Sequence, residues 1–443
     1  MKSNATSVSV SSLSKRQQVL SLGIIVSLFF VFGFVTWINA ILIPYFKGAF
    51  ELNHFDSYLV AFAFYIAYLV MAIPSGYLLR SVGFKKGIMI GFFIMALGAA
   101  FFIPAGIMQS YPLFLLGLFT LGIGLAVLQT AANPYVTILG DKERAAQRFS
   151  IMGISNKLAG ILAPLLFAAI VLRPEDQSTL DSLAQLTPLE KELAIEGLLR
   201  RVVLPYAVVS GILLLLGLLV KFSPLPEIHT EGEHDKGAES AIDTEGKTSI
   251  LHFPHLVLGS IAIFFHVGSQ VIAVDSIIGY AQHTGLSFSE AKSFPSYTLT
   301  ATIVGYLLGI VMVPRFLSQL TALRVCTILG FLLSMAILLF SGEHTLFGYQ
   351  TDISVWFLVL LGFANSMIWA GVWPLAMSGL GRFLKIGASL LVMALCGNAI
   401  MPMLYGYFAD TMGIKDAYLV LLPCYAYLIY YSFHGFNVKR WRR

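Results

Sequence analysis

Residues 18–46, QVLSLGIIVSLFFVFGFVTWINAILIPYF, decide the fold class of this chain. The stretch contains no charged residue, and it is longer than the run of about 20 apolar residues that a helix needs to cross the hydrocarbon core of a membrane. It is too long for a cleavable signal peptide, and it ends in Asn39, Pro44 and Tyr45 rather than in the small residues of a cleavage site. The stretch therefore predicts a membrane-spanning helix.

The composition extends this character to the whole chain. Of its 443 residues, 57% are apolar and only 12% are charged, whereas soluble domains contain about 25% charged residues. The mean hydropathy of +0.81 agrees, and together these values exclude an ordinary soluble enzyme. The three cysteines lie in apolar runs, which excludes a disulfide scaffold or a thiolate metal cluster. The bases lie at the ends of apolar runs, so the net charge of +5 does not indicate a nucleic-acid partner.

Apolar runs between charged or turn-rich breaks predict twelve membrane-spanning helices. They lie near residues 18–46, 56–80, 87–107, 111–140, 149–172 and 202–221, and then near 253–282, 294–314, 323–341, 352–379, 387–409 and 416–434. We therefore expect an all-α membrane protein with the lipid bilayer as its surroundings.

An acidic segment separates these helices into two groups of six. Residues 222–250 contain almost no apolar side chains, so the segment cannot bury enough surface to order itself. Two six-helix bundles joined by such a linker are the arrangement of the major facilitator superfamily, in which substrate binds between the halves near the midplane. The expected divisions are a cytoplasmic N-tail (1–17), an N-terminal bundle (18–221), the cytoplasmic linker (222–250), a C-terminal bundle (251–434) and a basic C-tail (435–443).

The distribution of Lys and Arg predicts the orientation. Most of the 28 bases fall in segments on the side of the two termini, and cytoplasmic loops are the ones enriched in bases. We expect a multi-pass protein of the cell inner (plasma) membrane with both termini in the cytoplasm, and a monomer. On the outer side, residues 173–201 mix charged residues with Leu and Ala, which predicts a short surface helix there.

Ionisable groups are rare within the predicted spans. Asp275 is the only acid well inside a span, Lys157 the only base and His266 the only histidine. Such groups are costly at membrane depth, and each is a candidate for function. Asp275 is a candidate coupling residue. His266 follows two phenylalanines and is interpreted as a helix contact rather than a proton carrier.

Amides and tryptophans within the spans form the candidate substrate site. The side chains concerned are Trp37, Asn39, Gln129, Asn133, Asn156, Gln270, Asn365, Trp369, Trp373 and Asn398. Amides donate and accept at once, which suits hydroxyl groups, and an aromatic face suits the apolar face of a sugar. Two plainer interpretations stay open: intramembrane amides also bond helix to helix, and an aromatic stripe can be packing alone. Asn133 can equally satisfy carbonyls freed by the proline that follows it.

Several motifs resemble the fucose/glucose/galactose–cation symporter family of the major facilitators. The stretches that carry the resemblance are residues 29–34 (FFVFGF), 39–44 (NAILIP), 128–137 (LQTAANPYVT), 268–270 (GSQ) and 385–389 (KIGAS), with Asn156 and Gly160 between them. The run in 128–137 is the most specific of these. The resemblance covers nearly the whole chain and implies alternating-access uptake of a hexose driven by protons or sodium.

Two departures from this family concern the coupling ion. The resemblance implies an acid in span 1 where this chain has Ala40, and a glutamate in span 4 where it has Gln129. Neither residue can bind a proton. Either Lys157 stands as a fixed cation in place of a transported one, or coupling has moved to a site at Asp275. Because Gln270, Ser276 and backbone carbonyls could support that carboxylate as neutral oxygen ligands, Asp275 is a candidate sodium ligand, and we expect sodium rather than a proton.

The sequence thus predicts a secondary importer of a neutral hexose, of the glucose or galactose type or N-acetylglucosamine. No enzymatic activity and no cofactor beyond the coupling ion, Na⁺ or H⁺, are expected. An uncoupled sugar facilitator of the same fold is the first alternative, since it needs no ionisable group in its cavity. A multidrug exporter is a weaker alternative, because it would require a larger apolar cavity and no ordered set of amides. The last alternative is a membrane enzyme or sugar sensor, but the sequence contains no catalytic or phosphate-binding motif that would support it.

Overall fold

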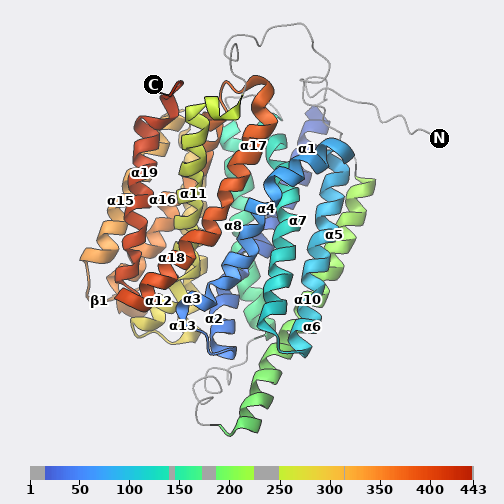
Figure 1. Cartoon of the computed structure of the whole chain (residues 1–443). Coiled ribbons are helices and arrows are strands. Elements are labelled where there is room, and N and C mark those ends of the chain that lie inside the picture. The colour runs from blue at the N-terminus through green and yellow to red at the C-terminus, as the bar shows by residue number, and fades with distance from the viewer. Residues whose placement is uncertain (1–14, 139–144, 172–185, 224–248, 314, 442–443) are drawn as a thin grey trace, which may run out of the picture.

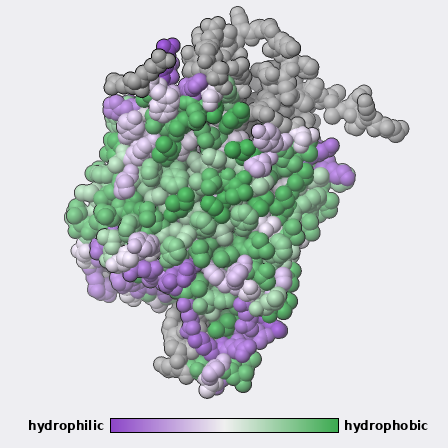
Figure 2. All heavy atoms as spheres, viewed as in Figure 1, coloured by the Kyte–Doolittle hydropathy of each residue, from purple (hydrophilic) through white to green (hydrophobic). Residues whose placement is uncertain are grey.

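The computed structural model describes residues 15–138, 145–171, 186–223, 249–313 and 315–441. In this part of the chain, eleven helices are long and apolar enough to cross a membrane. Figure 1 shows them packed side by side in one bundle, and Figure 2 shows apolar side chains covering its middle between two more hydrophilic ends. The expected all-α membrane architecture is confirmed.

The N-terminal half is built from nine described helices. These are α1 (Lys15–Trp37), α2 (Asn39–Ala49), α3 (His54–Ser57), α4 (Leu59–Val82), α5 (Phe84–Ala100), α6 (Phe102–Ile107), α7 (Tyr111–Ile138), α8 (Ala145–Val171) and α10 (Pro188–Phe222). The pairs α1–α2 and α5–α6 each run nearly continuously and form one span, so the half contains six spans.

The C-terminal half repeats this plan. Its α-helices are α11 (Pro254–Asp275), α12 (Ile277–His283), α13 (Phe288–Ala291), α14 (Phe294–Met312), α15 (Gln319–Leu339), α16 (Ile353–Ala376), α17 (Leu384–Met393), α18 (Gly397–Met412) and α19 (Leu421–Phe433). Its short 3₁₀ turns are η4 (Ile250–His252), η5 (Gly381–Phe383), η6 (Ala394–Cys396), η7 (Asp416–Val420) and η8 (Gly435–Asn437). The twelfth predicted span, 416–434, is built from η7 followed directly by α19, and for this reason it is not among the eleven long helices.

Close helix contacts at glycine place the candidate site residues. A Cβ on Gly33 of α1 would lie 2.0 Å from the backbone oxygen of Asn156 on α8, and a Cβ on Gly397 of α18 would lie 2.1 Å from the backbone oxygen of Phe264 on α11. Only glycine permits such approaches. In each half, therefore, the first and fifth spans pack closely on one another, with the glycine on the first span in the N-terminal half and on the fifth span in the C-terminal half. The hydrogen bond from Lys157 of α8 to Gln270 of α11 joins the two halves.

The two halves contact one another at both ends of the bundle. We call the end with α3 and the β1–β2 hairpin the hairpin face, and the opposite end, where the C-terminus lies, the terminal face (Figure 1). At the terminal face, Nε1 of Trp441 donates to the backbone oxygen of Leu251, just before α11. At the hairpin face, Asp410 of α18 accepts hydrogen bonds from the backbone N–H groups of His54 and Phe55. At the terminal face, Gln147 of α8 donates to the backbone oxygen of Val313 at 3.2 Å.

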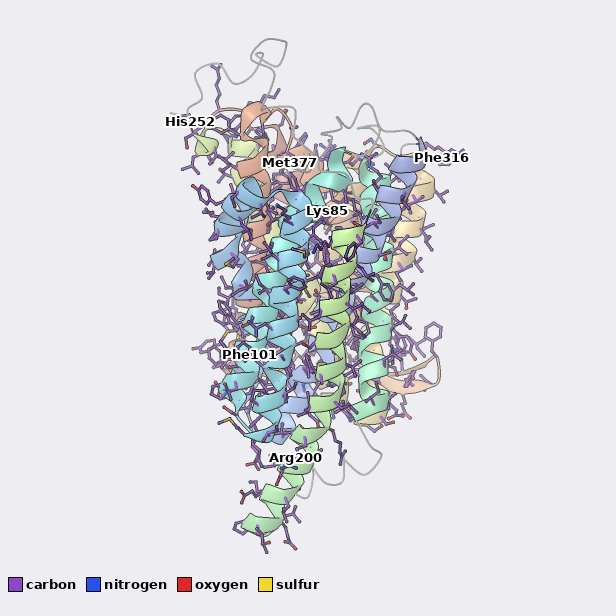
Figure 3. All side chains as sticks on the ribbon, turned by 90° about the vertical axis from the view of Figure 1, so that its right-hand side faces the viewer. Lys85, Phe101, Arg200, His252, Phe316 and Met377 are labelled. Atoms are coloured by element: carbon purple, nitrogen blue, oxygen red, sulfur yellow. The ribbon has the colours of Figure 1, made fainter. Side chains whose placement is uncertain are left out.

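The sixth span differs from its prediction. Helix α10 begins at Pro188 and continues without a break to Phe222, so it projects beyond the bundle on the side of Arg200 (Figures 1 and 3). Thr187 caps it through a capping box with Glu190, which fixes the start well before the apolar run. The short surface helix expected within 173–201 is present from Pro188 onward, but it is the first part of α10 rather than an element distinct from the sixth span. Residues 172–185 lie outside the described part of the chain.

A two-stranded hairpin precedes α16 and was not predicted. Strands β1 (Glu343–Leu346) and β2 (Tyr349–Asp352) pair antiparallel across a two-residue turn. Both turn residues, Phe347 and Gly348, have positive φ, which matches the right-handed twist of the strands. The predicted linker, 222–250, falls almost entirely outside the described residues, and the domain divisions and the orientation in the membrane stay predictions.

Candidate substrate site between the two halves

Lys157 joins the two halves near the middle of the bundle. Its Nζ donates a hydrogen bond to Oε1 of Gln270 on α11 at 3.0 Å, and it lies 3.9 Å from the centroid of the Trp37 ring on α1. The side chain is only 4% exposed. Its hydrogen-bond partner is therefore a neutral amide, and among the described residues no ion pair joins Lys157 to an acid. A buried ammonium is thus held by one carbonyl oxygen and one indole face.

Asn156 positions Trp37 rather than facing an open space. The indole Nε1 of Trp37 donates to Oδ1 of Asn156 at 2.9 Å, and Nδ2 of Asn156 donates to the backbone oxygen of Phe29 at 3.3 Å. Gly160 leaves room for the ring, since a Cβ there would lie 2.5 Å from Cδ1 of Trp37. The amide therefore orients the indole on which the Lys157 ammonium rests.

The C-terminal half contributes two neighbouring helix faces. Gln270 lies one turn after His266 on α11, and Trp369 lies one turn after Asn365 on α16. Trp369 is half-buried and stacks on Trp373 with ring centroids 5.0 Å apart. The Trp373 ring also meets Phe149 of α8 at 6.2 Å, so the aromatic pair is shared by the two halves.

Asn365 belongs to a buried polar cluster. Its Oδ1 accepts a hydrogen bond from the hydroxyl of Tyr425 on α19 at 3.0 Å, and its side chain lies beside His266. Asn365, a predicted site residue, and His266, which the sequence predicts to be a helix contact, therefore lie at the same place in the structure.

The remaining predicted amides are more dispersed. Nε2 of Gln129 donates to the hydroxyl of Tyr68 on α4 at 2.9 Å, which is a helix-to-helix bond within the N-terminal half. Asn133 and Asn398 are buried on α7 and α18, at 2% and 8% exposure. The side chain of Asn39 lies outside the described part of the chain. Among the predicted site residues, Trp37 and Gln270 contact Lys157 directly, and Asn156 binds Trp37. The hydrogen bond of Gln129 goes to Tyr68 and to none of these three.

Asp275 ends α11 and is buried. It is 3% exposed, and within the described residues its Oδ2 has no hydrogen-bond partner. The oxygens expected to support it are engaged elsewhere: Gln270 binds Lys157, and Oγ of Ser276 donates to the backbone oxygen of Ile272 at 2.6 Å and lies 2.8 Å from the hydroxyl of Tyr418. In the described ranges no three His, Cys, Asp or Glu side chains gather as a metal site.

One contact between the two halves, at the hairpin face, involves no residue that the sequence predicts for the site. Nδ1 of His54 lies 2.7 Å from Oδ1 of Asp410, and the rings of Tyr58 and Tyr405, which come from the same two halves, meet edge to face at 5.9 Å. Partial burial lowers the pKa of His54, and the nearby Lys47 ammonium lowers it further, against the opposing effect of Asp410. Asp410 lies at the end of a predicted span, but no local pattern pairs it with a residue more than 350 positions earlier.

Residues 25–385 match the family described as the Major Facilitator Superfamily. The chain belongs to the major facilitator superfamily. Within this superfamily, the motifs identified in the sequence place it with the fucose/glucose/galactose–cation symporters, and the relatives below agree.

Among its relatives in the superfamily, a glucose/galactose transporter of Brucella abortus is 31% identical over 92% of each chain. A putative glucose/galactose transporter of Helicobacter pylori is 30% identical, covering 96% of this chain and 99% of the relative. The L-fucose-proton symporter of Escherichia coli is 28% identical, covering 94% and 93%. A solved major facilitator transporter, FucP in the outward conformation, aligns with a TM-score of 0.73 at 27% identity over 94% of this chain and 99% of that one. The protein is thus a multi-pass membrane protein of this superfamily.

Proposed function

We propose that the protein takes up a neutral hexose across the cell inner membrane by alternating access, coupled to a cation. The observation that carries the proposal is the contact of Lys157 with Trp37 and Gln270, because it brings an indole face and an amide from the two halves to one buried place. A sugar ring uses such a face for its C–H groups and such an amide for its hydroxyls. The names of the glucose/galactose relatives support the substrate class.

Alternating access requires contacts that break in turn at the two ends. The bonds of Asp410 to His54 and Phe55 at the hairpin face and the bond of Gln147 to Val313 at the terminal face are suited to this, because each joins one half to the other. With both termini in the cytoplasm, as the distribution of bases predicts, the hairpin face is the outer one.

Asp275 is the proposed coupling group. A carboxylate buried without a counter-charge is costly, so the acid gains by binding a cation. Sodium takes several oxygen ligands, whereas a proton needs one atom. Because Gln270 and Ser276 are engaged elsewhere, and because a relative is named as a proton symporter, we place the proton ahead of the sodium that the sequence suggested.

An uncoupled facilitator is the second candidate, and the buried Lys157 ammonium favours it, because a fixed cation can stand where a transported one would bind. Purified protein in proteoliposomes tests both proposals. Hexose uptake is measured with a proton gradient, with a sodium gradient and with neither. Accumulation above the outside concentration with a proton gradient supports coupling to protons. Accumulation only with sodium restores the earlier prediction. Equilibration in all three conditions supports the facilitator, and no hexose uptake overturns the proposed substrate class.

A further inference from the structure

The tip of the β1–β2 hairpin carries a residue that its turn does not favour. Phe347 is 87% exposed, which makes it the most exposed of the large apolar side chains in the described part of the chain. Its φ is +52°, and that of Gly348 is +86°. Two-residue turns with positive φ at both positions favour Asn, Asp or Gly, because the Cβ of other residues is crowded there. Neither the turn nor contact with water accounts for a phenylalanine at this position.

The tip folds back along the bundle instead of extending beyond its end. The ring of Phe347 meets that of Trp356 with centroids 5.2 Å apart, and Trp356 lies in the first turn of α16. The Trp356 ring stacks at 6.3 Å on Tyr297, which lies in the first turn of α14. Both helices belong to membrane-spanning segments. The tip is therefore placed where two spans begin, and not out beyond them.

The hairpin and these two turns form a cluster of aromatic side chains with polar edges. The hydroxyls of Tyr297 and Tyr349 lie 3.1 Å apart, and the Tyr349 ring is 5.3 Å from that of Phe294. Tyr and Trp are enriched where the hydrocarbon of a membrane meets the headgroups, since one end of each side chain is apolar and the other is polar. The composition of this cluster is therefore typical of a membrane interface.

The hairpin itself is polar at one end and apolar at the other. Its strands pair Glu343 with Asp352 at the base and Leu346 with Tyr349 next to the turn. Glu343 is exposed, and its carboxylate accepts a hydrogen bond from Nε2 of Gln350 at 3.2 Å. The charged groups thus lie at the base, which suits an element whose base remains in water while its tip enters a membrane.

The tip also continues a surface that faces lipid. Leu332 and Leu339 are exposed on one face of the spanning helix α15, seven residues apart, and Phe340 follows them at 58% exposure. Figure 1 shows β1 at the edge of the bundle, next to α15. Because exposed apolar side chains of a membrane-spanning helix face the lipid chains, the bilayer lies beside the tip.

We infer that Phe347 inserts into the interfacial region of the surrounding bilayer, where headgroups meet acyl chains, and that the hairpin anchors the connection between α15 and α16 there. Insertion withdraws the aromatic ring from water, which offsets the unfavourable backbone conformation of the turn. With both termini in the cytoplasm, as the distribution of bases predicts, the leaflet concerned is the outer one. This inference goes beyond the proposed hexose uptake and does not depend on it.

Spin labels at two hairpin positions test the insertion in the full-length protein, reconstituted into vesicles of phosphatidylcholine and phosphatidylglycerol. One label is attached to Phe347→Cys at the tip and the other, as a matched control, to Glu343→Cys at the base; the native cysteines are all buried. Spin relaxation is measured with oxygen, which concentrates among the acyl chains, and with a water-soluble nickel complex. We expect the ratio of oxygen to nickel accessibility to be severalfold higher at the tip than at the base.

A second pair of variants keeps the test independent of the label. Phe347→Trp retains an aromatic ring at the tip, and lipids brominated close to their headgroups should quench the fluorescence that it adds, whereas that of Glu343→Trp should be unaffected. Equal accessibility ratios at the two labels, or equal quenching of the two tryptophans, would overturn the inference. Spin–spin broadening at Phe347→Cys that disappears on dilution with unlabelled protein would place a second copy on the tip and would refute contact with lipid. Hexose uptake by the unmodified protein stands or falls separately from all of these results.

Discussion

At the scale of single residues, Lys157 combines a cost in stability with a place at the centre of the proposed site. A buried ammonium held only by neutral partners is not compensated for its lost hydration, and apolar replacements of buried charges are often neutral or stabilising. We expect Lys157→Met to leave the melting temperature in detergent unchanged or higher while raising KM for the hexose about tenfold. Thermal unfolding and uptake kinetics measure the two quantities. A melting temperature several degrees lower with an unchanged KM would show that Lys157 is purely structural.

Asp275 gives the sharpest test of coupling at the same scale. Asn has the size of Asp but cannot bind a proton, so Asp275→Asn should abolish accumulation driven by a proton gradient while sugar counterflow continues. Asp416→Asn is the control, since this acid is exposed at the start of η7 and should leave accumulation intact. Counterflow and gradient-driven uptake are measured on the same vesicles. Accumulation at the level of the unmodified protein would eliminate Asp275 as the coupling group.

At the scale of helices, the α1–α8 contact should be the least tolerant of added volume. A Cβ on Gly33 would overlap the backbone oxygen of Asn156, and a backbone atom cannot move aside as a side chain can. We expect Gly33→Ala to destabilise the protein by about 1–3 kcal/mol. Gly23→Ala on the same helix is the matched control, because nothing lies within 4 Å of its Cβ position and alanine favours the helix. Melting temperatures in detergent compare the two, and equal values would contradict the tight contact.

The elements also show what the sequence can reveal. Hydropathy predicted the membrane spans because a run of apolar residues is a local property. The start of α10 is also encoded locally, because Thr187 and Glu190 form a capping box. It was not predicted, because it lies before the apolar run that defined the predicted span. The strands of the β1–β2 hairpin have only four residues each, and their sequences show no alternation of apolar and polar residues. The site residues were identified by type alone, because no local pattern pairs Lys157 with Gln270, 113 positions later.

At the scale of the whole molecule, the proposed transport cycle depends on a balance between the contacts at the two ends. At the hairpin face, the contact of His54 with Asp410 contains two titratable groups, and Lys47 and His283 also act on the imidazole. The terminal-face contact of Gln147 with Val313 has no titratable group of its own. Acidification should therefore act on the contact of His54 with Asp410 and leave the hydrogen bond of Gln147 to Val313 unaffected.

The direction of this effect follows from the lowered pKa of His54. Burial and the Lys47 charge favour the neutral imidazole in the closed hairpin face, so a proton binds more readily once the face has opened and the pKa has returned toward 6.5. The closed hairpin face is therefore fully favoured above pH 6.5, and it is progressively lost as the pH falls below this value. Spin labels on Glu51→Cys and Thr411→Cys, two exposed positions on opposite halves, should move apart between pH 7.5 and pH 5.5. His54→Gln should flatten this dependence, and an undiminished dependence in that variant would assign the response to another group.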